Sequence, residues 1–380
     1  MSRPLASCLI AVMSVVALGA SAPWIASPRQ PTRGPGSSDY AYDCVRDTSH
    51  GLGALAYRLF EPDCARAQTN PSAPRPLIVF LHGFQLTDPA LYSGWIRHLV
   101  RRGGVVVFPI FQSGPFDFYP TDNAAVAIRS ALDELRQPEH EGVDVSNFTL
   151  VGHSLGAGVA LNLGAIAGEG RIPFPANIVA VAPALNLDPA APGRPDRFGF
   201  VRDWGLTPAL TRVTIVVGEQ DQLVGDESAF VAWPHFDHLP TPNRAYVQMR
   251  SDDHGSIPLV ANHLAPLSPD GLWIPGALEV NADDFLLWGI TDALIACPPA
   301  QLMDRCPAAP LSVGRWSDGT SMRPALQINA GTPARISTTT GNASSYVFLP
   351  IFERLAAWCP YLGSLCGVDP LTAERTRDEL

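Results

Sequence analysis

Short apolar runs alternate with amphipathic segments through the middle of the chain. The runs 77–81 (LIVFL), 105–108 (VVVF) and 178–182 (IVAVA) are almost continuously apolar, which is typical of parallel strands buried on both faces. Between the first two, apolar residues recur at helical spacing over 91–99. Strands separated by helices need crossover connections, and these produce a parallel sheet with helices on both faces. We therefore expect an α/β fold with a mostly parallel central sheet, and ligand contacts at the carboxyl ends of its strands.

The composition excludes several other classes of protein. Of the 380 residues, 46% are hydrophobic and 16% are charged, as expected for a globular chain with a sizeable core. The formal net charge of −10 gives no general attraction to nucleic acid or anionic lipid. All 26 basic residues are Arg, so lysine Schiff-base chemistry is excluded.

The N-terminus has the pattern of an export signal. Arg3 precedes the apolar stretch Leu9–Ala20, and small residues follow it, as in a secretory signal peptide. We predict a signal over 1–22, a flexible Pro/Gly/Ser-rich leader over 23–39, and a secreted, periplasmic or cell-surface protein. An uncleaved segment would instead tether the chain to a membrane, because about 20 apolar residues span a bilayer.

Beyond this signal the chain keeps an even number of cysteines, which in an exported protein suggests disulfides. Their grouping into close pairs favours the pairings 44–64, 297–306 and 359–366, and no cluster has the ligand spacing of a zinc site. The strand–helix alternation covers 40–297, which we assign to a catalytic domain. The Pro- and Ser/Thr-rich residues 298–380 are predicted to form a small disulfide-stapled C-terminal extension.

The strongest motif is GHSLG at 152–156. The apolar strand 148–151 (FTLV) runs into it and a helix of small residues follows, which is the setting in which G-x-S-x-G forms a sharp strand-to-helix turn. Such a turn exposes the serine hydroxyl at the carboxyl end of the strand. We predict that Ser154 is a nucleophile, and a nucleophilic serine needs a base near neutral pH.

The partners of this serine should follow strands later in the chain, in the order acid and then histidine. Asp221 follows the strand 213–217 directly and is the favoured acid, with Glu219 as the competing choice. His254 lies in the loop after the last predicted strand, 246–249, and is the favoured base. The competing histidines are His235, His238 and His263.

A tetrahedral intermediate also needs two backbone N–H donors aimed at its oxyanion. The N–H of Leu155 follows the nucleophile at a helix N-terminus, where the helix dipole adds to the effect. The second should come from His82–Gln85 (HGFQ), after the strand 77–81. We assign it to Phe84, with Gln85 as second choice, and expect His82 to brace the loop.

These motifs resemble the α/β-hydrolase family. HGF, GHSLG, GEQD and DDHG occur in the family's order over about 55–297, and the chain is most similar to exported dienelactone-hydrolase-like and chlorophyllase-like esterases. The segment 314–319 (GRWSDG) resembles, more loosely, a terminal segment of bacterial members. The resemblance implies a Ser–Asp–His hydrolase of small-molecule or lipid-like esters that needs no cofactor and no metal.

The resemblance does not select a substrate, because this fold hosts many activities. Aromatic residues in the long loop 109–120 and in other connections could form an apolar mouth for the substrate, or could simply pack those loops. A peptidase, an acyltransferase and a catalytically silent binding module remain the alternative functions.

Overall fold

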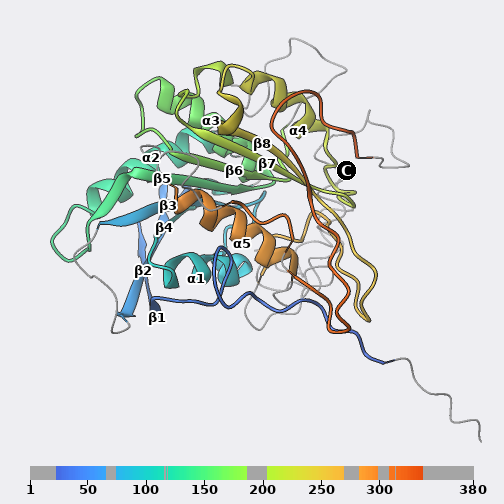
Figure 1. Ribbon diagram of the computed structural model, residues 1–380. Coiled ribbons are helices and arrows are strands. Elements are labelled where there is room, and N and C mark those ends of the chain that lie inside the picture. Colours follow the sequence, from blue (N-terminus) through green and yellow to red (C-terminus); the bar gives the residue numbers. More distant parts are fainter. Residues whose placement is uncertain are drawn as a thin grey trace, which may run out of the picture.

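A computed structural model describes residues 23–65, 74–114, 117, 119–185, 203–268, 282–297, 308–312 and 314–336. Its centre is a twisted nine-stranded sheet in the order β1-β2-β4-β3-β5-β6-β7-β8-β9 (Figure 1). The strands are β1 (Tyr42–His50), β2 (Tyr57–Ala65), β3 (Arg75–Leu81), β4 (Val105–Pro109), β5 (Val143–His153), β6 (Asn177–Val181), β7 (Arg212–Gly218), β8 (Arg244–Met249) and β9 (Leu326–Ile328).

The inner part of this sheet is parallel, from β4 through β3, β5, β6 and β7 to β8. Only β1, β2 and β9, at the two edges, pair in the antiparallel sense. The predicted mostly parallel sheet is therefore confirmed. Successive parallel strands place their carboxyl ends along one edge, which is where loops can bring distant residues together.

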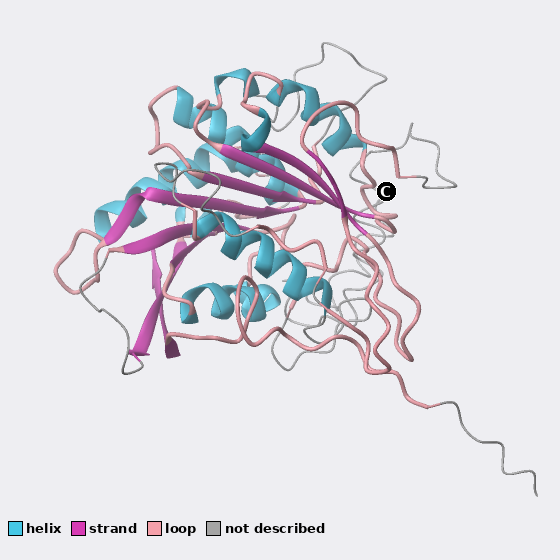
Figure 2. Cartoon of the chain, in the orientation of Figure 1, coloured by secondary structure: helices cyan, strands magenta, loops and turns pink. Residues whose placement is uncertain are grey.

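Helices cover both faces of the sheet (Figure 2). They are α1 (Ser93–Arg101), α2 (Pro120–Glu134), α3 (Leu155–Gly168), α4 (Glu227–Ala232) and α5 (Ala282–Ile295). One core contains Leu77 and Val79 of β3 together with side chains of α2, α3 and α4. The opposite core contains Ile78 and Phe80 together with side chains of α1 and α5. This alternation follows from the two-residue period of a strand, which sends neighbouring side chains to opposite faces.

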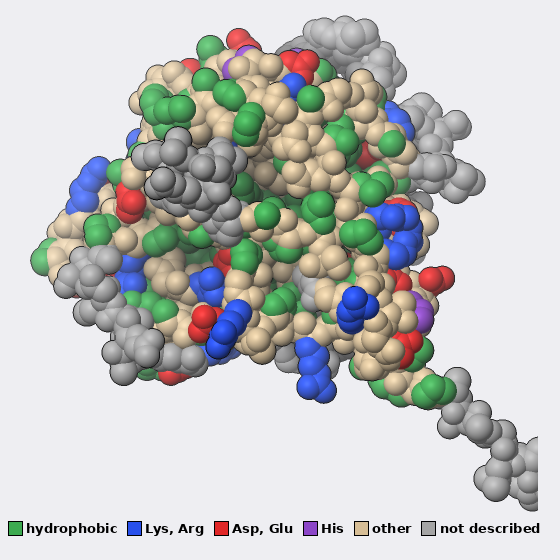
Figure 3. Space-filling model, in the orientation of Figure 1, with side chains coloured by type: hydrophobic (Ala, Val, Ile, Leu, Met, Phe, Trp, Pro, Cys, Tyr) green, Lys and Arg blue, Asp and Glu red, His purple; other side chains and the backbone are tan. Residues whose placement is uncertain are grey.

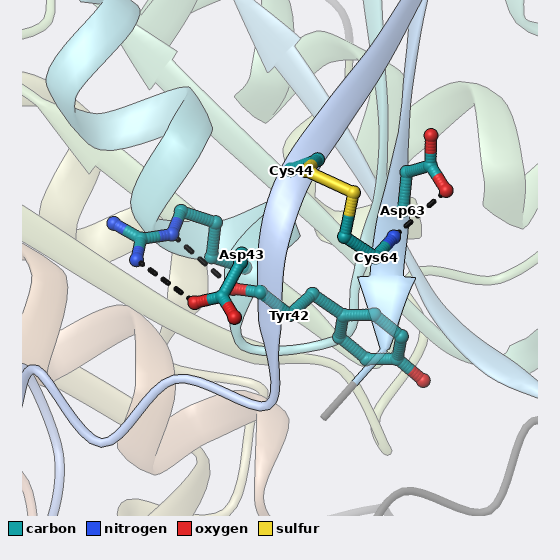
Figure 4. Close-up of a disulfide and its surroundings, with 6 residues drawn as sticks. Tyr42, Asp43, Cys44, Asp63 and Cys64 are labelled. Atoms are coloured by element: carbon teal, nitrogen blue, oxygen red, sulfur yellow. Dashed lines mark hydrogen bonds and ion pairs between the residues drawn. A yellow bond between two sulfur atoms is a disulfide. The ribbon is translucent and has the colours of Figure 1, made fainter. Parts of the chain in front are cut away.

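A disulfide joins the two strands at one edge of the sheet (Figure 4). Cys44 of β1 and Cys64 of β2 are bonded, with their Cα atoms 5.2 Å apart, so this predicted pair is confirmed. It lies near the N-terminus, whereas we expected a disulfide-stapled extension at the C-terminus. The remaining predicted pairs involve Cys306, Cys359 and Cys366, which lie outside the described residues.

Removing this bond should destabilise the protein measurably. The two cysteines are 20 residues apart, and cross-linking a loop of that size stabilises a fold by about 3 kcal/mol through the unfolded chain. Replacing Cys44 and Cys64 together by Ser should lower the free energy of unfolding in urea by about that amount. An unchanged urea midpoint would contradict this expectation.

Part of the predicted leader 23–39 contacts the domain, around Gly36 and Ser37. The N–H of Gly36 donates to Asp292 Oδ2 at 2.7 Å, and Ser37 is fully buried. A Cβ at Gly36 would lie 2.6 Å from the carbonyl oxygen of Phe285 in α5. The Pro, Gly and Ser residues of the segment 23–39 disfavour regular helices and strands, but the small ones let its backbone approach a helix closely.

The described part of the predicted extension continues the same sheet. β9 pairs with β8, and the backbone N–H of Ile336 donates to Asp226 beside α4 at 2.6 Å. Arg335 also forms an ion pair with Asp226. Residues 326–328 therefore extend the sheet beside β8, and residues 335–336 are held beside α4.

Among the described residues, no helix has both the length and the apolar character that a membrane crossing requires. The predicted signal, 1–22, lies outside the described residues. On the face shown in Figure 3, Arg and acidic side chains are interspersed. Some exposed Arg side chains pair with acidic residues, as Arg171 does with Asp122.

Candidate active site

The turn between β5 and α3 holds Ser154 in a strained conformation. Ser154 has φ 56° and ψ −120°, a region that non-glycine residues rarely occupy. Glycines two positions away on either side allow this. A Cβ at Gly152 would lie 2.3 Å from the carbonyl oxygen of Gly156, and a Cβ at Gly156 would lie 2.1 Å from that of Leu81. Neither position can therefore carry a side chain, and the GHSLG motif folds as predicted.

Asp221 is fixed in the loop that follows β7. Its side chain is fully buried, and Oδ1 accepts hydrogen bonds from the N–H groups of Leu223 and Val224, both at 3.0 Å. Its Oδ2 lies 2.7 Å from Nδ1 of His263. Burial alone would raise the pKa of Asp221, but the charge and hydrogen bond of His263 and the two N–H donors lower it below its usual value. The carboxylate is therefore ionised at neutral pH.

His263 completes a continuous chain of hydrogen bonds to the serine. Its Nε2 lies 2.9 Å from Ser154 Oγ, and its side chain is buried. Since an ionised carboxylate only accepts, Nδ1–H donates to Asp221, and in the neutral imidazole Nε2 is then the acceptor for the serine hydroxyl. Hydroxyl, imidazole and carboxylate thus lie in the order that a nucleophilic serine requires.

The prediction that His254 lies against Ser154 is wrong. His254 Nε2 lies 2.7 Å from Asp318 Oδ2, and its side chain is about a third exposed. The cause is the path of the loop after β8. Asp252 pairs with Leu259, so the residues between them project away from the sheet. The chain then returns to the strand ends, where the N–H of Gln220 donates to the carbonyl of Ala261, and His263 follows two residues later.

A signal for this path is present in the sequence, although it is weak. Residues 251–256 (SDDHGS) are polar and consistent with an excursion into solvent, whereas the apolar pair Leu259–Val260 precedes His263 and marks a return to the core. In the structure Leu259 is buried. The position of a histidine relative to the end of a strand is thus a poorer guide than the burial of its neighbours.

The competing residues have other partners. Glu219 accepts a hydrogen bond from the N–H of Ser251 and pairs with Arg323. Nδ1 and Nε2 of His238 face the backbone carbonyls of His235 and Thr207. Asp221 and His263 contact each other beside Ser154, whereas Glu219 and His238 have the partners given above.

The loop after β3 lies directly beside the serine turn. The close approach of Gly156 to Leu81 places the first turn of α3, with Leu155, against the end of β3. Phe84 follows in a turn closed by a hydrogen bond from Leu86 N–H to Gly83 O at 3.0 Å. The N–H of Gln85, the second choice, donates instead to Gln112 Oε1 at 2.9 Å. The backbone N–H groups of Phe84 and Leu155 therefore remain our predicted donors to the oxyanion.

His82 is a brace of this loop, as expected. It is fully buried, and its ring is stacked on Phe111 with centroids 4.0 Å apart. Burial lowers its pKa to about 4, so the ring is neutral and its Nδ1–H donates to the carbonyl of Gly83 at 2.7 Å.

The aromatic residues considered for a substrate mouth divide into two groups. Phe111, Trp204 and Trp233 are buried and pack the connections, whereas Tyr119 is 68% exposed. Phe116, Phe118 and Trp273 lie outside the described residues.

A group of metal-binding side chains occurs elsewhere in the described part of the chain. Glu134, Glu139 and His140 could each offer one ligand atom to an ion. They precede β5, so they lie toward its amino end, whereas Ser154 follows its carboxyl end. The two ring nitrogens of His140 already contact Glu61 and Glu134.

Three comparisons with known proteins bear on this geometry. The profile described as "Alpha/beta hydrolase family" matches residues 78–326, about two thirds of the chain. A search of curated proteins finds no match. Among solved structures, the chain is similar to a carboxyl esterase of the fungus Tuber melanosporum at 20% identity and a TM-score of 0.42, over 57% of this chain and 79% of that one. That likeness is too distant to carry an argument. The family match runs from within β3 to the first residue of β9 and contains Ser154, Asp221 and His263, and the chain belongs to the α/β-hydrolase family.

Proposed function

We propose that this protein is a serine hydrolase that cleaves carboxylic esters through an acyl-enzyme on Ser154. The observation that carries the proposal is the position of His263, with Nε2 2.9 Å from Ser154 Oγ and Nδ1 2.7 Å from Asp221 Oδ2. In this proposal His263 is the general base and later the general acid, and Asp221 fixes its tautomer and stabilises the imidazolium.

The reaction would begin with transfer of the Ser154 hydroxyl proton to His263 Nε2 as Oγ attacks the ester carbonyl. The carbonyl oxygen becomes an oxyanion, which the N–H groups of Phe84 and Leu155 would stabilise. The bond to the alcohol oxygen then breaks, and the alcohol leaves with the proton from the imidazolium. A water molecule repeats these steps on the acyl-enzyme: His263 takes its proton, its oxygen attacks the acyl carbon, and the acid is released as the proton returns to Ser154.

The substrate would be a small-molecule or lipid-like ester that meets the protein outside the cytoplasm. The support for export is the signal-like N-terminal sequence together with the Cys44–Cys64 disulfide, since disulfides persist mainly in oxidising compartments. The interspersed charges on the face in Figure 3 offer no extended basic surface for a nucleic acid.

A fluorophosphonate probe tests the proposal directly. Such probes phosphonylate an activated serine, whose Oγ bonds to phosphorus as fluoride leaves, so the protein should gain one adduct, and peptide mass spectrometry should place it on Ser154. The same protein should hydrolyse p-nitrophenyl esters in a panel of increasing chain length. Cleavage of amide substrates would favour a peptidase, and transfer to added alcohols would favour an acyltransferase. Absence of both labelling and turnover would leave a binding module as the better account.

A further inference from the structure

Two buried side chains without a role in the proposed mechanism lie between two loops of the site. One is the loop His82–Gln85, here called the oxyanion loop, and the other carries His263. The hydroxyl of Tyr92, at the start of α1, lies 2.8 Å from the backbone nitrogen of Gly83 and 2.9 Å from Nδ1 of His153. The Nε2 of His153 lies 2.9 Å from the backbone carbonyl oxygen of His263. Gly83 precedes Phe84, so this series of contacts runs from a predicted oxyanion donor to the proposed base.

Donor and acceptor chemistry allows only one arrangement of protons along this series. The N–H of Gly83 must donate, so it donates to the Tyr92 oxygen. The carbonyl of His263 must accept, so His153 carries its proton on Nε2. The remaining nitrogen of His153, Nδ1, therefore accepts the Tyr92 hydroxyl proton. All three hydrogen bonds are satisfied at once and all point the same way.

The surroundings keep this arrangement intact. Tyr92 is fully buried and His153 is 1% exposed. Burial, followed by the nearby His263, lowers the pKa of His153 to about 3, and burial raises the pKa of the Tyr92 hydroxyl. Neither group changes its protonation near neutral pH. The Tyr92 ring also packs on Phe80 of β3, with centroids 4.9 Å apart, which fixes the position of its hydroxyl.

We propose that Tyr92 and His153 are positioning residues that hold the oxyanion loop and the His263 loop at fixed places on either side of Ser154. His153 is bonded covalently to Ser154, so the series passes through the residue next to the nucleophile. This proposal rests on the proposed function and adds a constraint to it. The oxyanion loop and the His263 loop are held by the same series of hydrogen bonds. Replacing either Tyr92 or His153 should therefore displace both loops.

The test compares Tyr92→Phe, His153→Phe and the double variant in p-nitrophenyl ester hydrolysis. A displacement of about 1 Å in a reacting group costs about 100-fold in rate, so each single variant should lose about 10- to 100-fold in kcat, with KM changed by less than about 3-fold. Because one chain is broken in either case, the double variant should lose little more than the worse single variant.

Tyr246→Phe is the matched control. Tyr246 is a buried tyrosine of β8 whose hydroxyl has no hydrogen-bond partner among the described residues. The same atom is removed, but no hydrogen bond is lost, so kcat should stay within about 2-fold of that of the unaltered protein.

Several outcomes would overturn the proposal. Losses in kcat that multiply in the double variant would show that the two residues act independently, and a Tyr92→Phe variant that behaves like Tyr246→Phe would show no positioning role. If His153→Phe fails to fold, His153→Gln keeps a donor toward His263 and should lose less than 10-fold in kcat. A loss as large as that of Tyr92→Phe would contradict the role assigned to the hydrogen bond between residue 153 and the His263 carbonyl. Labelling of Ser154 by the fluorophosphonate in all variants separates these failures from failure of the proposed function.

Discussion

Replacing His263 by Ala is expected to lower kcat for p-nitrophenyl ester hydrolysis by at least about 10,000-fold. Loss of the base of a serine triad costs about a million-fold in comparable hydrolases, and the oxyanion donors and substrate binding keep only a residual rate. Nε2 of His263 is the atom placed 2.9 Å from Ser154 Oγ, so replacing the ring removes the base that lies beside that hydroxyl. Steady-state kinetics on the purified variant measure the loss.

His254→Ala is the control for this variant, because it removes the same side chain from the same loop. His254 contacts Asp318 at an exposed position, so we expect kcat within about 3-fold of the unaltered value, in keeping with a surface ion pair that contributes about 0–1 kcal/mol. The reverse pattern, with His254→Ala inactive and His263→Ala active, would contradict the assignment of the base.

Replacing Ser154 by Ala should abolish turnover to a similar or greater extent, by about a million-fold. Alanine keeps the Cβ that the backbone already accommodates at φ 56° and removes only the nucleophilic oxygen. The variant should therefore fold with an unchanged thermal midpoint and should take up no fluorophosphonate. Circular dichroism and intact-mass measurements test both statements. A variant that retains more than about 1% of kcat would show that Ser154 is not the nucleophile.

The sheet and the serine turn could be predicted from the sequence because their signals are local. Continuous apolar runs predict buried strands. Positions 152 and 156 must be glycine, because a Cβ there would lie 2.3 and 2.1 Å from neighbouring carbonyl oxygens. Asp221 could be predicted for a similar reason, because it follows β7 by only a few residues and has little freedom to lie elsewhere.

The histidine could not be predicted in the same way, because its place depends on contacts that are distant in sequence. The excursion after β8 is held by Asp252, whose Oδ2 accepts hydrogen bonds from Trp316 Nε1 and from the N–H of Arg323. Those partners lie more than 60 residues further along the chain. A rule based on distance from a strand end contains no information about these partners and therefore favours His254.

The contacts made by the two terminal segments cannot be predicted from the sequence, for a different reason. Composition rich in Pro, Gly and Ser indicates that regular helices and strands are absent, but it does not indicate that the backbone is free. The N–H of Gly36 donates to Asp292 and Ile336 donates to Asp226, each through a single buried backbone group. Such contacts leave no periodic pattern in the sequence.

The most direct test of the account is the low-field proton NMR spectrum of the purified protein. A proton held between His263 Nδ1 and Asp221 should give a resonance well downfield of the amide region. It should disappear in His263→Gln and in Asp221→Asn and persist in His254→Gln. A resonance that survives in His263→Gln but is lost in His254→Gln would show that the hydroxyl, imidazole and carboxylate do not converge as described.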